Sequence, residues 1–242
     1  MNANVIETNG LTKGTGSQMR VNHIDLRIPE GCVYGFLGPN GAGKTTTLKL
    51  LLGLLKPTAG DVIFFGQQMT DKNRLSILRH TGSLIESPSF YGHLTGLENL
   101  QIAAKLKKAP ASEIAKVLQT VRLYEQKDKK VKQYSLGMKQ RLGIAMALLG
   151  NPRVLILDEP TNGLDPAGIQ EIREFIKNLP VTHQMTVIVS SHLLSEIELM
   201  ADMVGIINHG ELIFQGTMAA LEAQGDGLED IFLKLTGGSE SL

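Results

Sequence analysis

The 242-residue sequence has a single cysteine, no excess of charge and no long apolar run, and each absence excludes a class of protein. Cys32 can form no disulfide within the chain, so we expect a reducing compartment, most simply the cytoplasm. The 24 Lys and Arg residues balance the 24 Asp and Glu residues, which argues against a nucleic-acid partner. The length suits one domain or two small ones with a large core.

A membrane-spanning helix and a secretion signal are also missing. A span needs about 20 consecutive, mostly apolar residues. The longest stretch without Asp, Glu, Lys or Arg, residues 178–195, is interrupted by Pro180, His183 and His192, so we interpret it as loop and strand. The first ten residues, MNANVIETNG, have neither the basic start nor the apolar stretch of a signal peptide.

Strand-like and helix-like patterns alternate along the chain, which is typical of an α/β protein with a mostly parallel sheet. Between about 86 and 150 the strand patterns give way to helical periodicity, with a capping-box spacing at Thr95 and Glu98. Asp165 precedes a proline and should cap a helix to Lys177. Other helices are expected at 44–52 and 111–122, and strands at 23–28, 32–37, 62–65, 82–85, 154–157, 185–190, 204–208 and 211–215.

A glycine-rich loop joins a predicted strand to a predicted helix and matches the pattern G-x-x-x-x-G-K-[ST]. Backbone N–H groups of such a loop can surround a phosphate, and the helix N-terminus adds partial positive charge. We expect Lys44 to reach the β- and γ-phosphates and the Thr45 hydroxyl to bind Mg²⁺. A glycine-rich turn can match by chance, but the flanking strand and helix favour a nucleoside triphosphate site. The nucleotide-binding residues are Gly38, Pro39, Asn40, Gly41, Ala42, Gly43, Lys44, Thr45 and Thr46.

Two carboxylates follow the apolar strand at 154–157, where parallel sheets bind their ligands. In isolation such a pair is often a solvated strand end, but together with the glycine-rich loop it favours a catalytic reading. Asp158 can bind Mg²⁺, and Glu159 can act as the general base that activates the attacking water. We therefore expect a Mg²⁺-dependent nucleoside triphosphatase.

The segment before this strand is Tyr134-Ser135-Leu136-Gly137-Met138-Lys139-Gln140-Arg141. Ser135 is a candidate N-cap, so the amides that follow could bind a phosphate. The segment resembles the LSGGQ signature of ATP-binding cassette (ABC) ATPases: it keeps Ser135, Gly137, Gln140 and Arg141, and it departs from the signature at Tyr134, Leu136 and Met138.

Further matches to the ABC family cover nearly the whole chain. Residues 160–165 resemble the D-loop region, and 190–192 resemble the switch-histidine segment, so the resemblance implies that His192 contacts the γ-phosphate. It also implies a head-to-tail homodimer that sandwiches ATP and Mg²⁺. In that dimer the partner chain completes each site with Ser135, Leu136, Gly137, Met138 and Asp165.

The family resemblance implies a P-loop NTPase fold of the ABC type. A RecA-like, mostly parallel sheet would carry an N-terminal antiparallel β part and an inserted helical subdomain. We expect one domain over 1–242, with the core at 1–86 and 151–221, the helical subdomain at 87–150 and a helical tail at 222–242. Leu228, Ile231, Phe232 and Leu235 share one face of the tail helix.

The resemblance further implies integral-membrane permease subunits and a peripheral position on the inner face of the cell membrane. Phe90 and Tyr91 would be exposed anchors for the permease, although both rings could equally pack inside the helical insert.

Glu86 stands where the family normally has a glutamine that contacts Mg²⁺ and senses the membrane subunits. A glutamate brings a full negative charge to the metal site, and we include Glu86 among the metal-binding and catalytic residues. It could instead be a solvated loop acid. A glutamate here resembles the ATPase subunits of bacitracin-type and lantibiotic self-immunity exporters, so we expect a drug or peptide-antibiotic exporter.

Two other functions stay open. A soluble ABC ATPase of translation or DNA repair usually has two cassettes or a long coiled-coil insert, and this sequence shows neither. A regulatory module with little turnover is suggested by Thr15 and Glu86, whereas Glu159 favours hydrolysis.

The first prediction concerns the nucleobase. Thr15 stands where the family usually has an aromatic residue that stacks on adenine, and such stacking contributes ~1–3 kcal/mol per base. We expect weak discrimination between ATP and GTP in a fluorescence titration. A strong preference for ATP would contradict this prediction.

Overall fold

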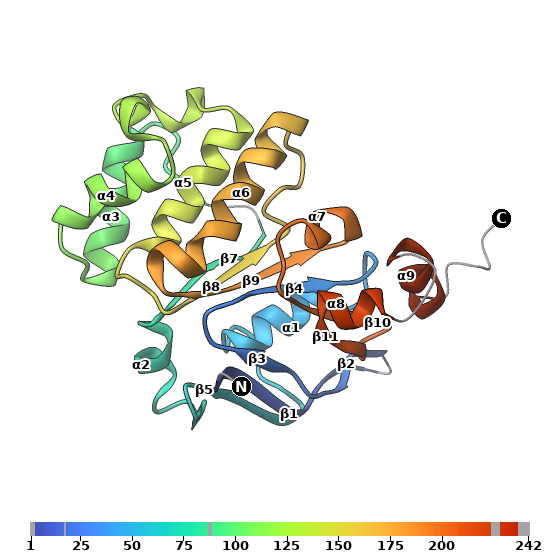
Figure 1. Ribbon diagram of the computed structural model, residues 1–242. Helices are drawn as coiled ribbons and strands as arrows, with labels where there is room; N and C mark the ends of the chain where they lie inside the picture. Colours follow the sequence, from blue (N-terminus) through green and yellow to red (C-terminus); the bar gives the residue numbers. More distant parts are fainter. Residues whose placement is uncertain (1–2, 17, 87–88, 224–227, 237–242) are drawn as a thin grey trace.

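The computed structural model describes residues 3–16, 18–86, 89–223 and 228–236. Figure 1 shows two sheets in layers, with helix α1 (Lys44–Leu51) between them and a group of helices on the far side of the larger sheet. That group comprises α3 (Gly96–Lys107), α4 (Ser112–Thr120), α5 (Leu136–Leu148) and α6 (Pro166–His183). Short helices α2 (Arg74–Leu78), α7 (Leu194–Glu198) and α8 (Met218–Glu222) and the tail helix α9 (Leu228–Thr236) complete the described set.

The larger sheet has six strands in the order β11-β10-β4-β9-β8-β7, and only β11 runs antiparallel. Its central strands β4, β8 and β9 are buried along their whole length, as expected for a parallel sheet covered on both faces. The strands are β4 (Val33–Leu37), β7 (Thr81–Leu84), β8 (Val154–Asp158), β9 (Thr186–Ser191), β10 (Met203–Asn208) and β11 (Glu211–Thr217).

The smaller sheet is antiparallel. β1 (Asn4–Thr15) pairs with β2 (Gln18–Ile24), β3 (Arg27–Pro29) and β5 (Ala59–Phe64), and β6 (Gln67–Gln68) pairs with β5. The expected α/β architecture, with an N-terminal antiparallel part and a helical region after β7, is therefore confirmed.

The predicted strand at 23–28 is wrong as one element. The chain bends between β2 and β3, with His23 at φ 54° and the Asp25 carboxylate accepting a hydrogen bond from the Gly10 amide at 2.6 Å. β1 was not predicted, because Gly10 at φ 58° and irregular register break the alternation of its residues.

The interpretation of 178–195 as loop and strand is also wrong in part. α6 continues past Lys177 to His183 and includes Pro180, and Gln184 ends it in a left-handed conformation at φ 50°. None of the described helices combines the length and the apolar character that crossing a membrane requires. The face predicted for the tail helix is confirmed for Ile231, which is buried, and for Phe232 and Leu235, which pack against the core. The side chain of Leu228 lies outside the described residues.

Cys32 lies just before β4, and burial, helped by the nearby Asp202 charge, raises the pKa of its thiol to about 12. A thiol in this state stays protonated and is a poor nucleophile.

We predict that Gly82→Ala destabilises the fold, because a Cβ on this residue of β7 would lie 2.4 Å from the Ala147 carbonyl oxygen of α5. Such overpacking costs ~1–3 kcal/mol, which thermal unfolding would report as a lower Tm. Gly92→Ala is the matched control, since its Cβ would lie 3.7 Å from its nearest neighbour, Lys132. Equal Tm values for the two variants would show that β7 and α5 are not in this close contact.

Candidate nucleotide-binding and catalytic site

Three buried strands deliver the candidate residues to one edge of the larger sheet. In the parallel register Leu37 of β4 is paired with Ser191 of β9, and Asp158 of β8 with Ser190. The segments that follow these strands are the glycine-rich loop, Glu159 and His192. The pairing of β4 with β9 therefore places residues 154 positions apart in the sequence side by side.

The glycine-rich loop depends on glycine where the backbone turns into α1. Gly43 caps α1 with φ 109°, and a Cβ there would lie 2.5 Å from the Arg20 carbonyl oxygen. A Cβ on Gly38 would lie 2.3 Å from the Ile207 carbonyl oxygen. The buried Lys44 ammonium donates to the carbonyl oxygens of Gly38 at 2.7 Å and of Pro39 at 3.2 Å.

Thr45 and Asp158 place a hydroxyl and a carboxylate side by side, with 2.8 Å from Thr45 Oγ1 to Asp158 Oδ2. Ser190 Oγ donates to the other Asp158 oxygen at 2.6 Å and accepts from the Glu159 N–H at 2.9 Å. Hydroxyl and carboxylate oxygens are the hard ligands that Mg²⁺ prefers. This pair of residues therefore fits a magnesium site.

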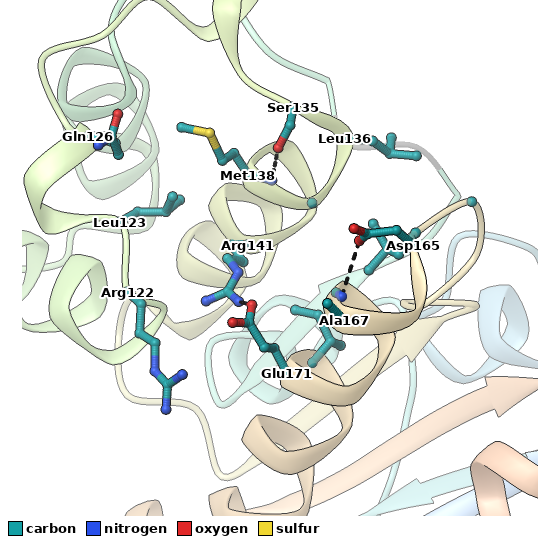
Figure 2. A pocket seen from close by; sticks show the side chains of 15 residues that line it. Arg122, Leu123, Gln126, Ser135, Leu136, Met138, Arg141, Asp165, Ala167 and Glu171 are labelled. Carbon is teal, nitrogen blue, oxygen red and sulfur yellow. Dashed lines mark hydrogen bonds and ion pairs between the residues drawn. The ribbon is translucent and has the colours of Figure 1, made fainter.

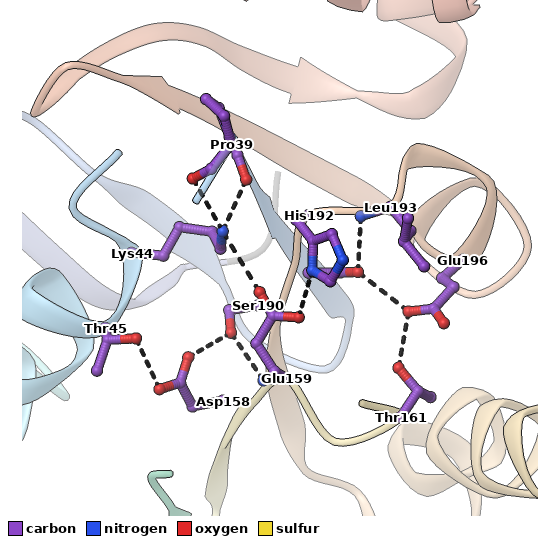
Figure 3. A network of polar contacts seen from close by, with 12 residues as sticks. Pro39, Lys44, Thr45, Asp158, Glu159, Thr161, Ser190, His192, Leu193 and Glu196 are labelled. Atoms are coloured by element: carbon purple, nitrogen blue, oxygen red, sulfur yellow. Dashed lines mark hydrogen bonds and ion pairs between the residues drawn. The ribbon is translucent and has the colours of Figure 1, made fainter. Parts of the chain in front are cut away.

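Glu159 lies between Lys44 and His192, as Figure 3 shows. Its Oε1 atom is 3.3 Å from Lys44 Nζ, and its Oε2 atom is 2.8 Å from His192 Nδ1. The Glu159 side chain is 21% exposed and that of Lys44 only 6%, so water screens the pair weakly. A bound phosphate would compete with this carboxylate for Lys44.

A hollow of about 380 Å³ opens over these groups. Its lining residues are Arg20, Asn40, Gly41, Gly43, Lys44, Thr45, Thr46, Glu159, Asn162 and His192. Sequence reasoning missed Arg20, because nothing in its local pattern shows that β2 passes beside Gly43. Within the described part of the chain, no hydrogen bond or ion pair holds the Arg20 guanidinium, so it can meet an anionic ligand.

The signature residues lie apart from this hollow. The Ser135 hydroxyl caps α5 by accepting from the Met138 N–H at 3.2 Å, and Asp165 caps α6 by accepting from the Gly168 N–H at 3.1 Å. Both line a separate hollow of about 600 Å³ (Figure 2), together with Leu136, Gly137, Met138 and an Arg141–Glu171 ion pair. This hollow and the one above Lys44 share none of their lining residues.

Glu86 lines a third hollow with Thr45, Asp158 and Glu159, and the start of α5 contributes Leu136, Lys139 and Gln140 to the same hollow. The Glu86 carboxylate binds Lys49 of α1 at 2.6 Å. Its side chain is 64% exposed. The structure therefore places Glu86 next to the candidate metal site and pairs it with a cation that sequence reasoning did not identify.

The two aromatic residues after Glu86 differ in their surroundings. Tyr91 is 54% exposed, whereas Phe90 is half-buried and packs against the core of the helical region. Of the two rings, that of Tyr91 is the more open to a partner, and it lies edge-on to His93 with 6.2 Å between the ring centroids.

A phosphate-binding loop, an acidic strand end and a histidine on one sheet edge define a P-loop nucleoside triphosphatase. The chain belongs to the ABC transporter family, whose model matches residues 21–162. As a member of this family it binds and hydrolyses ATP.

Curated relatives of high similarity are transport proteins. The chain is 52% identical to the bacitracin transport ATP-binding protein BcrA of Bacillus licheniformis, over 86% of this chain and 68% of that one. It is 42% identical to the lantibiotic transport ATP-binding protein SrtF of Streptococcus pyogenes, over 94% of both chains.

Solved structures agree with the fold. An ATP-binding subunit of an ABC transporter superposes with a TM-score of 0.84 at 27% identity, covering 96% of this chain and 99% of that one. A dimeric, post-hydrolysis ATP-binding cassette bound to ADP and Pi gives 0.78 at 26% identity, covering 88% and 98%. ABC cassettes thus form dimers and, as part of transporter complexes, work with permease subunits.

The Glu86–Lys49 pair generates a prediction about Mg²⁺. Glu86→Gln removes a negative charge near Thr45 and Asp158, so more Mg²⁺ should be needed for half-maximal ATP turnover. Lys49→Met releases the Glu86 carboxylate, so less should be needed. Stability should change little, since exposed pairs contribute at most ~1 kcal/mol.

The matched control is Lys56→Met, which breaks an exposed pair with Asp71. Identical Mg²⁺ dependence in all three variants would show that Glu86 is only a surface acid.

Proposed function

We propose that this chain is the ATPase subunit of a bacterial exporter that moves a bacitracin- or lantibiotic-type peptide antibiotic through separate permease subunits. One observation carries the catalytic part: the Glu159 carboxylate lies between Lys44 and His192, beside the Thr45–Asp158 pair. The named functions of BcrA and SrtF support the choice of cargo.

In the proposed mechanism Lys44 and the backbone N–H groups of residues 38 and 40–46 bind the phosphates of ATP, and Pro39 shapes the loop without donating. Thr45 and Asp158 would hold Mg²⁺, with Glu86 nearby, and the ion would supply positive charge against the phosphates. Phosphate binding draws Lys44 and His192 away from Glu159. The freed carboxylate then accepts a proton from the attacking water, while His192 contacts the γ-phosphate.

The proposed site is complete only in a head-to-tail homodimer. Ser135, Leu136, Gly137 and Met138, together with Asp165, would face the nucleotide of the partner chain. Two features support this arrangement: the N-terminus of α5 can bind a phosphate, and the hollow that Ser135 and Asp165 line shares no residue with the one above Lys44.

The dimer would lie on the inner face of the cell membrane, against the permease subunits. Residues 87–150 would form the coupling subdomain between the core segments 1–86 and 151–221, with the tail at 222–242. The exposed Tyr91 ring supports a contact there, since aromatic residues are enriched among interface anchors.

We predict that Glu159→Gln traps an ATP-dependent dimer. The amide cannot accept the proton from water, so turnover should fall at least ~100-fold, which is typical of losing a general base. Size exclusion with ATP and Mg²⁺ should show the dimer.

Glu174→Gln, an exposed residue on α6, is the control and should behave like the wild type. A Glu159→Gln chain that stays monomeric with ATP and Mg²⁺ would contradict the proposed sandwich.

A further inference from the structure

Glu196 is a buried carboxylate that the proposed mechanism does not use. It lies on α7, only 7% exposed. Its Oε2 atom accepts hydrogen bonds from Thr161 Oγ1 at 2.7 Å and from Ser191 Oγ at 3.0 Å, and Ser191 Oγ in turn accepts from the Leu193 N–H at 3.0 Å (Figure 3). One carboxylate oxygen thus joins two separate segments of the chain.

Among the residues that the structure describes, no Lys, Arg or His lies within ion-pair distance of the Glu196 carboxylate. Burying a charged side chain costs folding free energy, and an apolar residue at this position would stabilise the fold more. Hydrogen bonds to a charged acceptor are about twice as strong as neutral ones, so the Glu196 carboxylate holds the Thr161 and Ser191 hydroxyls strongly.

The two bridged segments carry the candidate catalytic groups. Thr161 comes two residues after Glu159 and is held in a turn by bonds from Asn162 N to Glu159 O and from Leu164 N to Thr161 O, both 3.1 Å. Ser191 comes directly before His192. Glu196 therefore links the segment that contains Thr161 to the residue directly before His192.

A second connection lies on the other face of the sheet. Successive residues of a strand point to opposite faces, so Ser190 reaches Asp158 and the Glu159 amide while Ser191 reaches Glu196. The ends of β8 and β9 are thus fixed on both faces. The hydrogen bonds of Ser190 hold the two carboxylate residues in position, and the hydrogen bonds of Glu196 hold the segments that follow β8 and β9.

We propose that Glu196 is a positioning residue that keeps Glu159 and His192 aligned for hydrolysis and couples His192 to the segment ending at Asp165. The inference rests on the proposed roles of Glu159 and His192. Because Glu196 does not touch the nucleotide pocket, its loss should slow the chemical step without weakening the binding of ATP.

The test separates turnover from binding in variants that change one hydroxyl. Thr161→Val removes one hydrogen-bond donor to Glu196 at constant side-chain shape. It should lower kcat about tenfold, as expected for one lost charge-assisted hydrogen bond. The Kd for a fluorescent ATP analogue should change less than about twofold. Thr161→Ser keeps the hydroxyl and should restore turnover. Ser191→Ala should resemble Thr161→Val, and the double variant should lose little more than either single variant, because both break the same bridge.

Thr8→Val is the matched control for a purely structural loss. Thr8 is fully buried in β1 of the smaller sheet and lines none of the hollows described above, and its hydroxyl donates to Ile24 O at 2.7 Å and accepts from Leu26 N at 2.8 Å. It should lower Tm at unchanged kcat.

Wild-type kcat in Thr161→Val, or a loss that Thr161→Ser fails to restore, would overturn the inference. Glu159→Gln measured alongside separates this failure from that of the proposed function. If Glu159→Gln abolishes turnover while Thr161→Val does not reduce it, only the role of Glu196 is wrong. If Glu159→Gln retains turnover, the proposed catalytic roles are wrong as well.

Discussion

The contact of the Glu159 carboxylate with the Lys44 ammonium and the His192 imidazole depends on the register of three buried strands. A slip of one residue in β8 or β9 would turn each side chain to the opposite face of the sheet and separate the three groups. The sheet can hold this register because β4, β8 and β9 are buried throughout and bonded along their length. Hydrogen bonds at the strand ends then hold the site residues in position. Ser190 bonds to Asp158 and to the Glu159 amide, and Ser191, directly before His192, bonds to Glu196.

The balance of charge in the sequence agrees with this site. Backbone amides, one buried lysine and a helix N-terminus can bind the phosphates, so an ATP-binding protein needs no excess of basic residues. Within one chain, however, Ser135 at the capped N-terminus of α5 and Lys44 of the glycine-rich loop line different hollows, although Leu136 of α5 and Thr45 of the loop share a third one. In the proposed dimer the N-terminus of α5 binds the nucleotide of the partner chain. This explains why a chain with an intact phosphate-binding loop has a second helix N-terminus suited to phosphate.

The local parts of the site could be predicted from the sequence, and the parts that depend on tertiary contacts could not. The loop before Lys44, the Asp158–Glu159 strand end and the caps at Thr95, Ser135 and Asp165 are short-range patterns with their own physical cause, and the structure has all three caps. The local sequence does not show that Arg20 lies beside Gly43, that Lys49 pairs with Glu86, or that Glu196 accepts a hydrogen bond from Thr161, because each of these contacts joins distant parts of the chain. β1 and the end of α6 were missed because Gly10 and Pro180 are ordinarily breakers, yet the fold accommodates both.

Whether two chains build each catalytic site is tested most directly by mixing two inactive variants. Lys44→Ala removes the phosphate-binding lysine, and Ser135→Arg blocks the N-terminus of α5, so each variant alone should be inactive. In a head-to-tail dimer of one chain of each kind, one site keeps both its lysine and its serine. With half of the dimers mixed and one of two sites intact, the account predicts recovery of about a quarter of wild-type ATP turnover. If the mixture stays as inactive as its components, the site does not draw its residues from two chains.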